Sequence, residues 1–372
     1  MRTDWRLIGL LFLVGLFAAA QFAKIALTLE WLEPIYPGVP LPYAVSAISV
    51  AGIVFGVTAG MIVATFGARR VLLAALGLAV VMSFLQALLP AFPVFMGLRL
   101  IEGFTHLAIV VAAPTLMAAV AVDRDKPVAM GLWGTFFGVG FAGAAAIIPL
   151  MSGPGAVYLA HGVFGLMLMA ALWPLLPRGV ARGVWEGGLW ARHMAIYTNP
   201  RLVAPAVGFL WHTIMFLGLL TFLPRFLGDW TAPVLPLIAL VGTFGAGWVA
   251  RSVAPRQILL VSFALTIVGF GMALVMPEAV RFLMMFLMLL ILGLVPGASF
   301  ANVPALNPDP ADQARANGAV AQIGNLGTAM SVPLFASTLS FGIAGPMVAT
   351  ICISMLGLGA VWLIHRKIAE SA

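Results

Sequence analysis

The chain has 372 residues, of which 63% are hydrophobic and only 8% are charged. Water-soluble domains carry about 25% charged residues, so this composition excludes an ordinary soluble protein and requires that lipid surround most of the chain. The formal net charge is +7. Because the basic residues are scattered in ones and twos between apolar runs, they argue against a nucleic-acid partner. The single cysteine, Cys352, lies in the last apolar run, so no intrachain disulfide is possible.

Twelve apolar segments follow one another along the chain, and a helix of roughly 20 residues is long enough to cross a hydrocarbon core about 30 Å thick. The first six are expected near residues 6–28, 42–65, 69–90, 93–121, 128–151 and 156–177. The second six are expected near residues 202–227, 233–250, 257–276, 280–305, 314–338 and 342–364. Backbone amides in lipid must be bonded within their own segment, so these runs predict an all-α membrane protein. We therefore expect two pseudo-symmetric six-helix bundles, residues 1–177 and 202–372, joined by a linker over residues 178–201.

The distribution of Lys and Arg predicts the orientation, because cytoplasmic loops carry the excess of these residues. With the N-terminus inside, fifteen basic residues fall on the inside and only two, Arg225 and Arg281, on the outside. Those on the inside are Arg2, Arg6, Arg69, Arg70, Arg124, Lys126, Arg178, Arg182, Arg192, Arg201, Arg251, Arg256, Arg315, Arg366 and Lys367. We therefore expect a multi-pass protein of the cell inner membrane with both termini in the cytoplasm.

The N-terminal segment has an alternative interpretation. Arg2 and Arg6, an apolar run and then Ala18-Ala19-Ala20 resemble a cleavable signal peptide. Its removal would leave eleven helices and spoil the pairing of the halves, so we expect it to be retained as the first span.

Residues 184–200 of the linker resemble an amphipathic helix lying on the cytoplasmic face. The segment contains Trp185, Trp190, Arg192, His193 and Tyr197. The alternative is a plain connection between the halves.

Two pairs of similar sequence patterns relate the halves to each other. The loop after the second span carries Gly60, Gly67, Arg69 and Arg70, and the loop after the eighth span carries a similar series, Gly247, Arg251 and Arg256. The fifth and eleventh spans share a glycine series, Gly131, Gly134, Gly138 and Gly140 in one and Gly318, Gly324, Asn325 and Gly327 in the other. Two halves related in this way are a recurrent plan of secondary transporters, with the substrate site near the bilayer midplane between the halves.

With these motifs the chain resembles a member of the major facilitator superfamily over essentially its whole length. The family's loop motif, Gly-x-x-x-Asp-Arg-x-Gly-Arg-Arg, is matched by its two glycines and its final basic pair, Gly60, Gly67, Arg69 and Arg70. Ala64 replaces the aspartate, which in the family helps latch the halves in the outward-open state, and Thr65 and Ala68 replace two arginines. The resemblance therefore leaves this latch without its acidic residue.

Two further family motifs lie in the fourth and fifth spans. The fourth-span motif, Arg-x-x-Gln-Gly in many members, is matched by Arg99, Glu102 and Gly103. The glycine and proline series of antiporters is present only in part, because Gly134, Gly138, Gly140 and Gly143 occur without its central Gly-Pro. This departure argues against a drug exporter.

Gly52, Gly56 and Gly60 recur every four residues on one face of the second span, which predicts close approach of another helix backbone. The face serves either as a smooth surface for rocking halves or as static packing.

Ionisable side chains within spans cost about 2.5–3.5 kcal/mol at a helix centre, so each invites a functional explanation. Lys24 of the first span, with Gln21, is a candidate for binding an anionic substrate group; alternatively, Lys24 extends to the surface or pairs with Glu30. In the anion-transporting branches of the superfamily, a basic residue often stands at a similar depth.

Arg99, Glu102 and His106 follow at i, i+3 and i+7 on one face of the fourth span. Arg99 and Glu102 form either a structural pair or a proton-coupling site, in which Glu102 alternates between protonated and arginine-paired states. His106 and Arg99 are also candidates for contacting substrate.

In the second half, His212 of the seventh span, Asn302 of the tenth and Asn325 of the eleventh, together with Gln322, offer hydrogen bonds to substrate or to neighbouring helices.

No phosphate-binding loop, metal-ligand motif or catalytic constellation is found in the sequence, so we expect no ATP hydrolysis, no metal, no cofactor and no enzyme activity. The sequence predicts a monomeric secondary active transporter that moves a small organic anion or amphipathic metabolite by alternating access, coupled to protons. The alternatives are a proton-driven exporter of hydrophobic compounds and a transporter-like receptor or assembly factor that does not transport.

Overall fold

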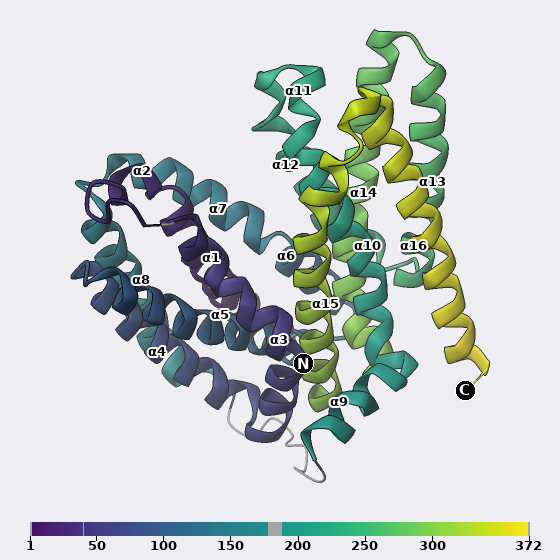
Figure 1. Cartoon of the computed structure of the whole chain (residues 1–372). Helices are drawn as coiled ribbons and strands as arrows, with labels where there is room; N and C mark the ends of the chain where they lie inside the picture. The colour runs from purple at the N-terminus through teal and green to yellow at the C-terminus, as the bar shows by residue number, and fades with distance from the viewer. Residues whose placement is uncertain (1, 40, 178–187, 371–372) are drawn as a thin grey trace. The chain divides into compact units, whose positions relative to one another are not determined.

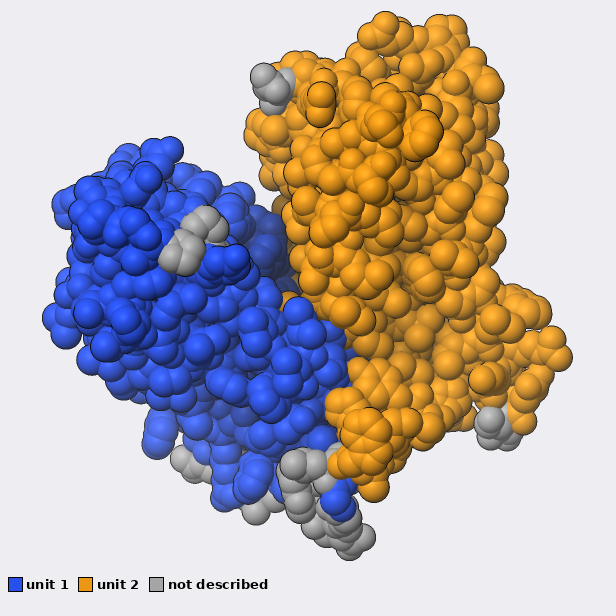
Figure 2. Space-filling view, in the orientation of Figure 1, with its two compact units in different colours: residues 1–122, 136–189, 309–322 blue, residues 123–135, 190–308, 323–372 orange. Residues whose placement is uncertain are grey.

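The computed structural model describes residues 2–39, 41–177 and 188–370, and its helices are labelled in Figure 1. Contacts between helices divide the chain into two compact units, coloured separately in Figure 2. Unit 1 comprises Met1–Val122, Phe136–Leu189 and Asp309–Gln322, and unit 2 comprises Asp123–Thr135, Trp190–Pro308 and Ile323–Ala372. In the described residues, helices and short connections make up both units.

Unit 1 is a helical bundle built around α5. Its elements are α1 (Trp5–Ala26), α2 (Leu29–Leu32), α3 (Pro42–Phe66), α4 (Ala68–Ala87), α5 (Phe92–Val120), α7 (Phe136–Ile147), η1 (Ile148–Leu150), α8 (Pro154–Leu175) and the first part of α15 (Pro310–Ala336). Helix α5 packs against α1, α3 and α4, and α8 packs against α1 and α4. Asp4 caps α1 by accepting a hydrogen bond from the Leu7 amide at 3.0 Å, and prolines open α3, α5 and α8, where no intrahelical amide donor is needed.

Unit 2 is a second helical bundle, with α14 at its centre. Its elements are α6 (Lys126–Gly134), α9 (Leu189–Thr198), α10 (Pro200–Phe222), α11 (Pro224–Leu227), η2 (Asp229–Thr231), α12 (Val234–Val249), α13 (Pro255–Val275), α14 (Glu278–Leu306), the rest of α15, η3 (Leu339–Phe341) and α16 (Ala344–Glu370). Helix α14 packs against α6, α10, α12 and α13, and α16 packs against α10 and α13. Fully buried aromatic side chains, including Phe263, Phe270 and Phe335, fill its core.

The twelve predicted spans all fall on helices. Nine helices in the described residues are long and apolar enough to cross a membrane, and α6 with α7 forms a tenth span, bent by 44°. The other two are α12, which has only 16 residues, and α15, whose 27 residues include Asp312 and Arg315. The prediction of a twelve-helix, all-α membrane fold is confirmed.

The span predicted as one helix over residues 128–151 is interrupted at Thr135. The Thr135 side chain donates to the Leu132 carbonyl at 2.7 Å and the Thr135 amide bonds to the same carbonyl at 3.1 Å. Gly134 precedes it, and such a glycine and hydroxyl pair favours a kink because the side chain competes for the helical carbonyl.

Glycines of the two repeated sequence patterns lie where helices pack closely against each other. In unit 1, α3 meets α15: a Cβ added at Gly60 would lie 2.7 Å from the Ala314 carbonyl oxygen, and one added at Gly318 would lie 2.7 Å from that of Gly56. In unit 2, α6 meets α12 in the same way, since a Cβ at Gly131 would lie 2.7 Å from the Gly247 Cα. The second span thus packs on the eleventh, and the fifth on the eighth. Glycine is required at these positions because any side chain would separate the backbones.

Two other motif glycines have separate roles. Gly67 has a φ of +88° between α3 and α4, a conformation that L side chains rarely adopt. A Cβ at Gly103 would lie 2.9 Å from the Ile48 carbonyl oxygen, so this glycine allows α5 to approach α3.

These units differ in composition from the halves expected in the sequence, because α6 belongs to unit 2 and the first part of α15 to unit 1. The division at residues 177 and 202 remains a prediction from the internal repeat. Residues 178–187 of the predicted linker, with Arg178, Arg182 and Trp185, lie outside the described residues. The remainder forms α9, on which Trp190 is exposed and Ile196 is buried.

Candidate functional site

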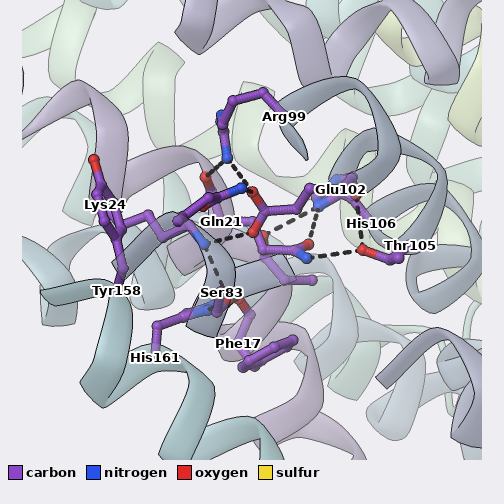
Figure 3. Close-up of polar contacts among 12 residues, drawn as sticks. Phe17, Gln21, Lys24, Ser83, Arg99, Glu102, Thr105, His106, Tyr158 and His161 are labelled. Carbon is purple, nitrogen blue, oxygen red and sulfur yellow. Dashed lines mark hydrogen bonds and ion pairs between the residues drawn. The ribbon is translucent and has the colours of Figure 1, made fainter. Parts of the chain in front are cut away.

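A buried charged cluster, formed by Lys24, Arg99 and Glu102, lies in unit 1 (Figure 3). The exposed fractions of these side chains are 1%, 0% and 0%. The Lys24 Nζ lies 2.6 Å from Glu102 Oε1, and Arg99 Nη1 pairs with Glu102 Oε2. Spacing by three residues places Arg99 and Glu102 side by side on α5, and the packing of α1 against α5 supplies Lys24. One carboxylate therefore bridges two cations.

Neutral groups hold the charged cluster in position. Arg99 donates from Nε to the Ala44 carbonyl at 3.0 Å and from Nη1 to the Gln21 carbonyl at 3.1 Å. The Gln86 side-chain amide donates to Glu102 Oε2 at 2.8 Å. The Arg99 Nη2 is buried and has no hydrogen-bond partner in the described residues. A buried guanidinium nitrogen without an acceptor is uncommon and marks the position as a candidate for binding an oxygen of a ligand.

A directed chain of hydrogen bonds leads from Lys24 to α8. Lys24 Nζ donates to Ser83 Oγ at 3.2 Å, Ser83 Oγ lies 2.8 Å from His161 Nδ1, and His161 Nε2 lies 3.1 Å from the Phe17 carbonyl. A carbonyl only accepts, so Nε2 carries the ring proton, and in the neutral ring Nδ1 accepts from Ser83. The ring also stacks on Phe17 at 4.0 Å. These contacts fix the direction in which Ser83 presents its lone pair to Lys24.

Tyr158 lies beside Lys24, which is 5.4 Å from the centre of the tyrosine ring. The Tyr158 and Thr28 hydroxyls are 3.2 Å apart, and Thr28 donates to the Lys24 carbonyl at 2.5 Å. An ammonium over an aromatic face is stabilised by the ring's quadrupole. The aromatic side chain therefore supplies a further partner for the Lys24 charge.

His106 lies at the edge of the charged cluster and is only partly buried. Its Nδ1 lies 3.1 Å from the Ala18 carbonyl and 3.2 Å from Gln21 Oε1. Both are acceptors, so Nδ1 carries the proton and Nε2 of the neutral ring keeps a lone pair. Gln21 in turn donates to Thr105 at 3.1 Å. His106 is therefore linked to the charged cluster through Gln21 rather than by a bond to Glu102.

Comparison with known proteins identifies the family. Residues 11–332 match the family profile described as Major Facilitator Superfamily. The chain belongs to this superfamily. Its members are transporters, so the protein is a transporter rather than an enzyme, and it is a multi-pass membrane protein.

Solved structures of the superfamily share the fold. The proton:xylose symporter XylE bound to 6-bromo-6-deoxy-D-glucose gives a TM-score of 0.74 at 14% identity, over 96% of this chain and 95% of that one. The human organic anion transporter MFSD10 (TETRAN) gives 0.70 at 18% identity, over 98% and 100%. A double tryptophan mutant of XylE gives 0.74 at 13% identity, over 98% and 96%. A search of curated protein sequences found no match. At these identities the likeness establishes the fold alone.

Five of the candidate residues predicted from the sequence gather in unit 1, namely Gln21, Lys24, Arg99, Glu102 and His106. Lys24 pairs with Glu102 and not with Glu30, because its side chain turns inward to the face of α5. Gln322 also lies in unit 1, where its side-chain amide donates to the Ile53 carbonyl at 2.7 Å. The other three candidates lie in unit 2 with neighbours of their own. His212 stacks on Phe216 at 4.9 Å, the Asn302 side-chain amide lies 3.3 Å from His365 Nε2, and Asn325 lies on α15.

Sequence reasoning missed four residues that contact the charged cluster or support it: Ser83, Gln86, Tyr158 and His161. Each pair is spaced by three residues in an apolar helix, Ser83 and Gln86 on α4 and Tyr158 and His161 on α8. Gln21 with Lys24 on α1, and Arg99 with Glu102 on α5, have the same spacing. Recurrence of this spacing in four spans was a signal in the sequence that these helices converge on one polar site.

The position of the family's loop aspartate carries no carboxylate in either of the two similar loops. Ala64, in place of the aspartate, is buried, and Arg69 donates to the Trp173 carbonyl at 2.8 Å. In unit 2, Arg251 stands four residues after Gly247, as Ala64 stands four after Gly60. Arg251 Nη2 lies 2.7 Å from Asp125 Oδ1. An ionic contact therefore joins the end of α12 to the start of α6.

Proposed function

We propose that the protein is a proton-coupled transporter of small organic anions in the inner membrane, working by alternating access, with both termini in the cytoplasm. The proposal rests mainly on the charge of the buried cluster, in which two cations contact one carboxylate. Membership of a transporter superfamily supports the transport step. The description of one structural neighbour as an organic anion transporter and of another as a proton symporter is in keeping with the solute class and the coupling.

The charge balance of the cluster suggests how an anion binds. Lys24 and Arg99 with ionised Glu102 give a net charge of +1 in a buried site, with His161 and His106 in their neutral forms. Protonation of Glu102 would release both cations, and binding of a monoanion would then restore the net charge to +1. Because a buried charge is costly without a partner, the empty site holds Glu102 ionised and the loaded site holds it protonated. One proton would thus move with one monoanion.

Specific donors are available for the anion in this scheme. Arg99 Nη2 already lacks an acceptor, and Arg99 Nη1 and Lys24 Nζ would be freed when Glu102 is protonated. An arginine fork binds a carboxylate through two parallel hydrogen bonds, which adds geometric selectivity to the charge. These donors favour a carboxylate-bearing solute over a neutral one.

The proposal can be tested with purified protein in sealed proteoliposomes. A panel of radiolabelled monocarboxylates, amines and neutral solutes is assayed for counterflow and for accumulation driven by an imposed proton gradient. We expect carboxylates to be transported, and Glu102→Gln to retain counterflow while losing proton-driven accumulation. Retained accumulation in Glu102→Gln would refute the coupling role.

Lys24→Met is the second variant, because it leaves Arg99 and Glu102 as a balanced pair and is expected to fold. We expect it to weaken carboxylate affinity by at least ten-fold, since about 1.4 kcal/mol corresponds to a factor of ten. Lys126→Met, which removes a cation from an exposed pair with Asp123, is the matched control and should leave affinity unchanged. Equal affinity in Lys24→Met and wild type would count against the anion site.

A further inference from the structure

A polar cavity lies in unit 2, where the start of α13 meets the end of α16. Its volume is about 170 Å³. It is lined by Arg256, Leu260, Trp362, His365 and Arg366. No acidic residue lines it. The cavity is separate from the charged cluster of unit 1 and has no part in the function proposed above.

The two arginines give the cavity a positive charge. Arg256 has no ion-pair partner in the described residues. Arg366 bonds from Nε to Glu370 at 2.7 Å and lies 5.6 Å from the Trp362 ring. That arrangement occupies one nitrogen of the Arg366 fork and leaves its Nη groups for an acceptor. Two guanidinium groups around one small cavity suit a phosphate, which accepts paired hydrogen bonds from each.

His365 adds a neutral donor to the two arginines. Its side chain is 5% exposed, and its Nε2 lies 3.3 Å from the Asn302 side-chain amide. Because that amide nitrogen only donates, Nε2 accepts and the proton of the neutral ring is on Nδ1. The ring orientation is thus fixed from inside the helix bundle, with one N–H left for a ligand.

The surroundings of the cavity favour a lipid as the source of the phosphate. Both helices are long and apolar enough to cross a membrane, and the cavity lies at their ends, which corresponds to the level of the head groups. Along the same helices, Val261, Leu265 and Leu363 are exposed by 55%, 44% and 54%, an apolar surface for acyl chains. Trp362, exposed by 51%, has the amphipathic character of a residue at the membrane interface. Basic pockets between spanning helices bind anionic head groups in this way.

We propose that this cavity binds the phosphate of an anionic phospholipid, with Arg256 and Arg366 as its main contacts and His365 as a further donor. The acyl chains lie along the exposed apolar residues of α13 and α16. The lipid would join the ends of these two helices at the membrane surface.

Native mass spectrometry of the full chain in detergent tests the proposal. The protein is titrated with phosphatidylglycerol and, separately, with phosphatidylcholine of the same acyl chains. We expect phosphatidylglycerol to bind more tightly, and the Arg256→Gln/Arg366→Gln double variant to lose roughly five-fold in affinity for each arginine removed. The control is Arg124→Gln/Lys367→Gln, which removes the same charge from residues that do not line the cavity and should bind as wild type does.

Two results would overturn the proposal. Equal affinity of wild type and the arginine double variant for phosphatidylglycerol would show that the cavity is not the site. Displacement of the bound phosphatidylglycerol by millimolar inorganic phosphate would show that the ligand is a free phosphate and not a lipid. A thermal unfolding curve of each variant, recorded without added lipid, establishes that a loss of affinity does not reflect a loss of fold.

Discussion

The charge of the buried cluster predicts an unequal response to removal of its members. Glu102→Gln leaves Lys24 and Arg99 facing each other without an anion at a site that is 0–1% exposed. Lys24→Met instead leaves Arg99 paired with Glu102, and the net charge of the site falls to zero. The variant that removes the one carboxylate should therefore cost far more stability than the one that removes a cation.

The magnitudes follow from the behaviour of buried ion pairs. Removing one partner of a buried pair costs about 3–5 kcal/mol because the other charge is left uncompensated, and we expect this for Glu102→Gln. An apolar replacement that leaves the remaining charges balanced is often close to neutral, so Lys24→Met should cost about 1 kcal/mol or less. This variant loses the ion pair to Glu102 at 2.6 Å and the hydrogen bond to Ser83 at 3.2 Å, while Arg99 continues to pair with Glu102.

Unfolding in mixed micelles, followed by tryptophan fluorescence, gives the free energy of unfolding of each variant. Lys126→Met serves as the control for removing a lysine, because its partner Asp123 is 97% exposed and such exposed pairs contribute little to stability. If Lys24→Met were as destabilising as Glu102→Gln, the reasoning from charge balance would be wrong.

Two further predictions concern the helix contacts. Asp125→Asn and Arg251→Gln should each lower the free energy of unfolding by about 1 kcal/mol, because each removes the same partly exposed ion pair. For the same reason the double variant should lose no more than either single variant. Additive losses in a double-mutant cycle would contradict this prediction. Gly60→Val should prevent normal folding, since its Cβ would lie 2.7 Å from a carbonyl of α15, whereas Gly143→Val, which has open space around it, should express and elute from size exclusion as wild type does.

Much of the fold was readable from the sequence because lipid imposes a simple rule. A spanning segment must be apolar and must bond its own backbone, so length and hydropathy located all twelve spans. Two features of the fold could not be predicted from length and hydropathy. The break at Thr135 depends on a side-chain bond to the Leu132 carbonyl, which hydropathy does not register. The placement of α6 in unit 2 and of the first part of α15 in unit 1 depends on which glycine-bearing helix faces pack together. The repeated glycines in the sequence indicated these faces but not the helices that they contact.

The candidate site was only partly predictable, because ionisable residues are conspicuous in an apolar span and neutral polar ones are not. Lys24, Arg99 and Glu102 were therefore found one by one. The sequence did not show that a single carboxylate holds both cations, since Lys24 and Glu102 are distant along the chain and meet only through the packing of α1 on α5. His161 and Ser83 were overlooked because each is ordinary alone, and only their positions opposite Lys24 give them a role.

The two units differ in where their charged side chains lie. Variants in the two units are therefore expected to change different transport parameters. Among the buried side chains that the structure describes, the only Lys, Arg, Asp or Glu residues are the three of the charged cluster in unit 1. In unit 2 the buried polar groups are neutral or histidine, and its Arg251–Asp125 pair is partly exposed at helix ends. Variants of the charged cluster should therefore change substrate affinity and coupling, whereas Asp125→Asn should change the rate of transport at saturating substrate with little change in affinity. Counterflow measured over a range of substrate concentrations separates these effects, and a large change in affinity for Asp125→Asn would show that the division is wrong.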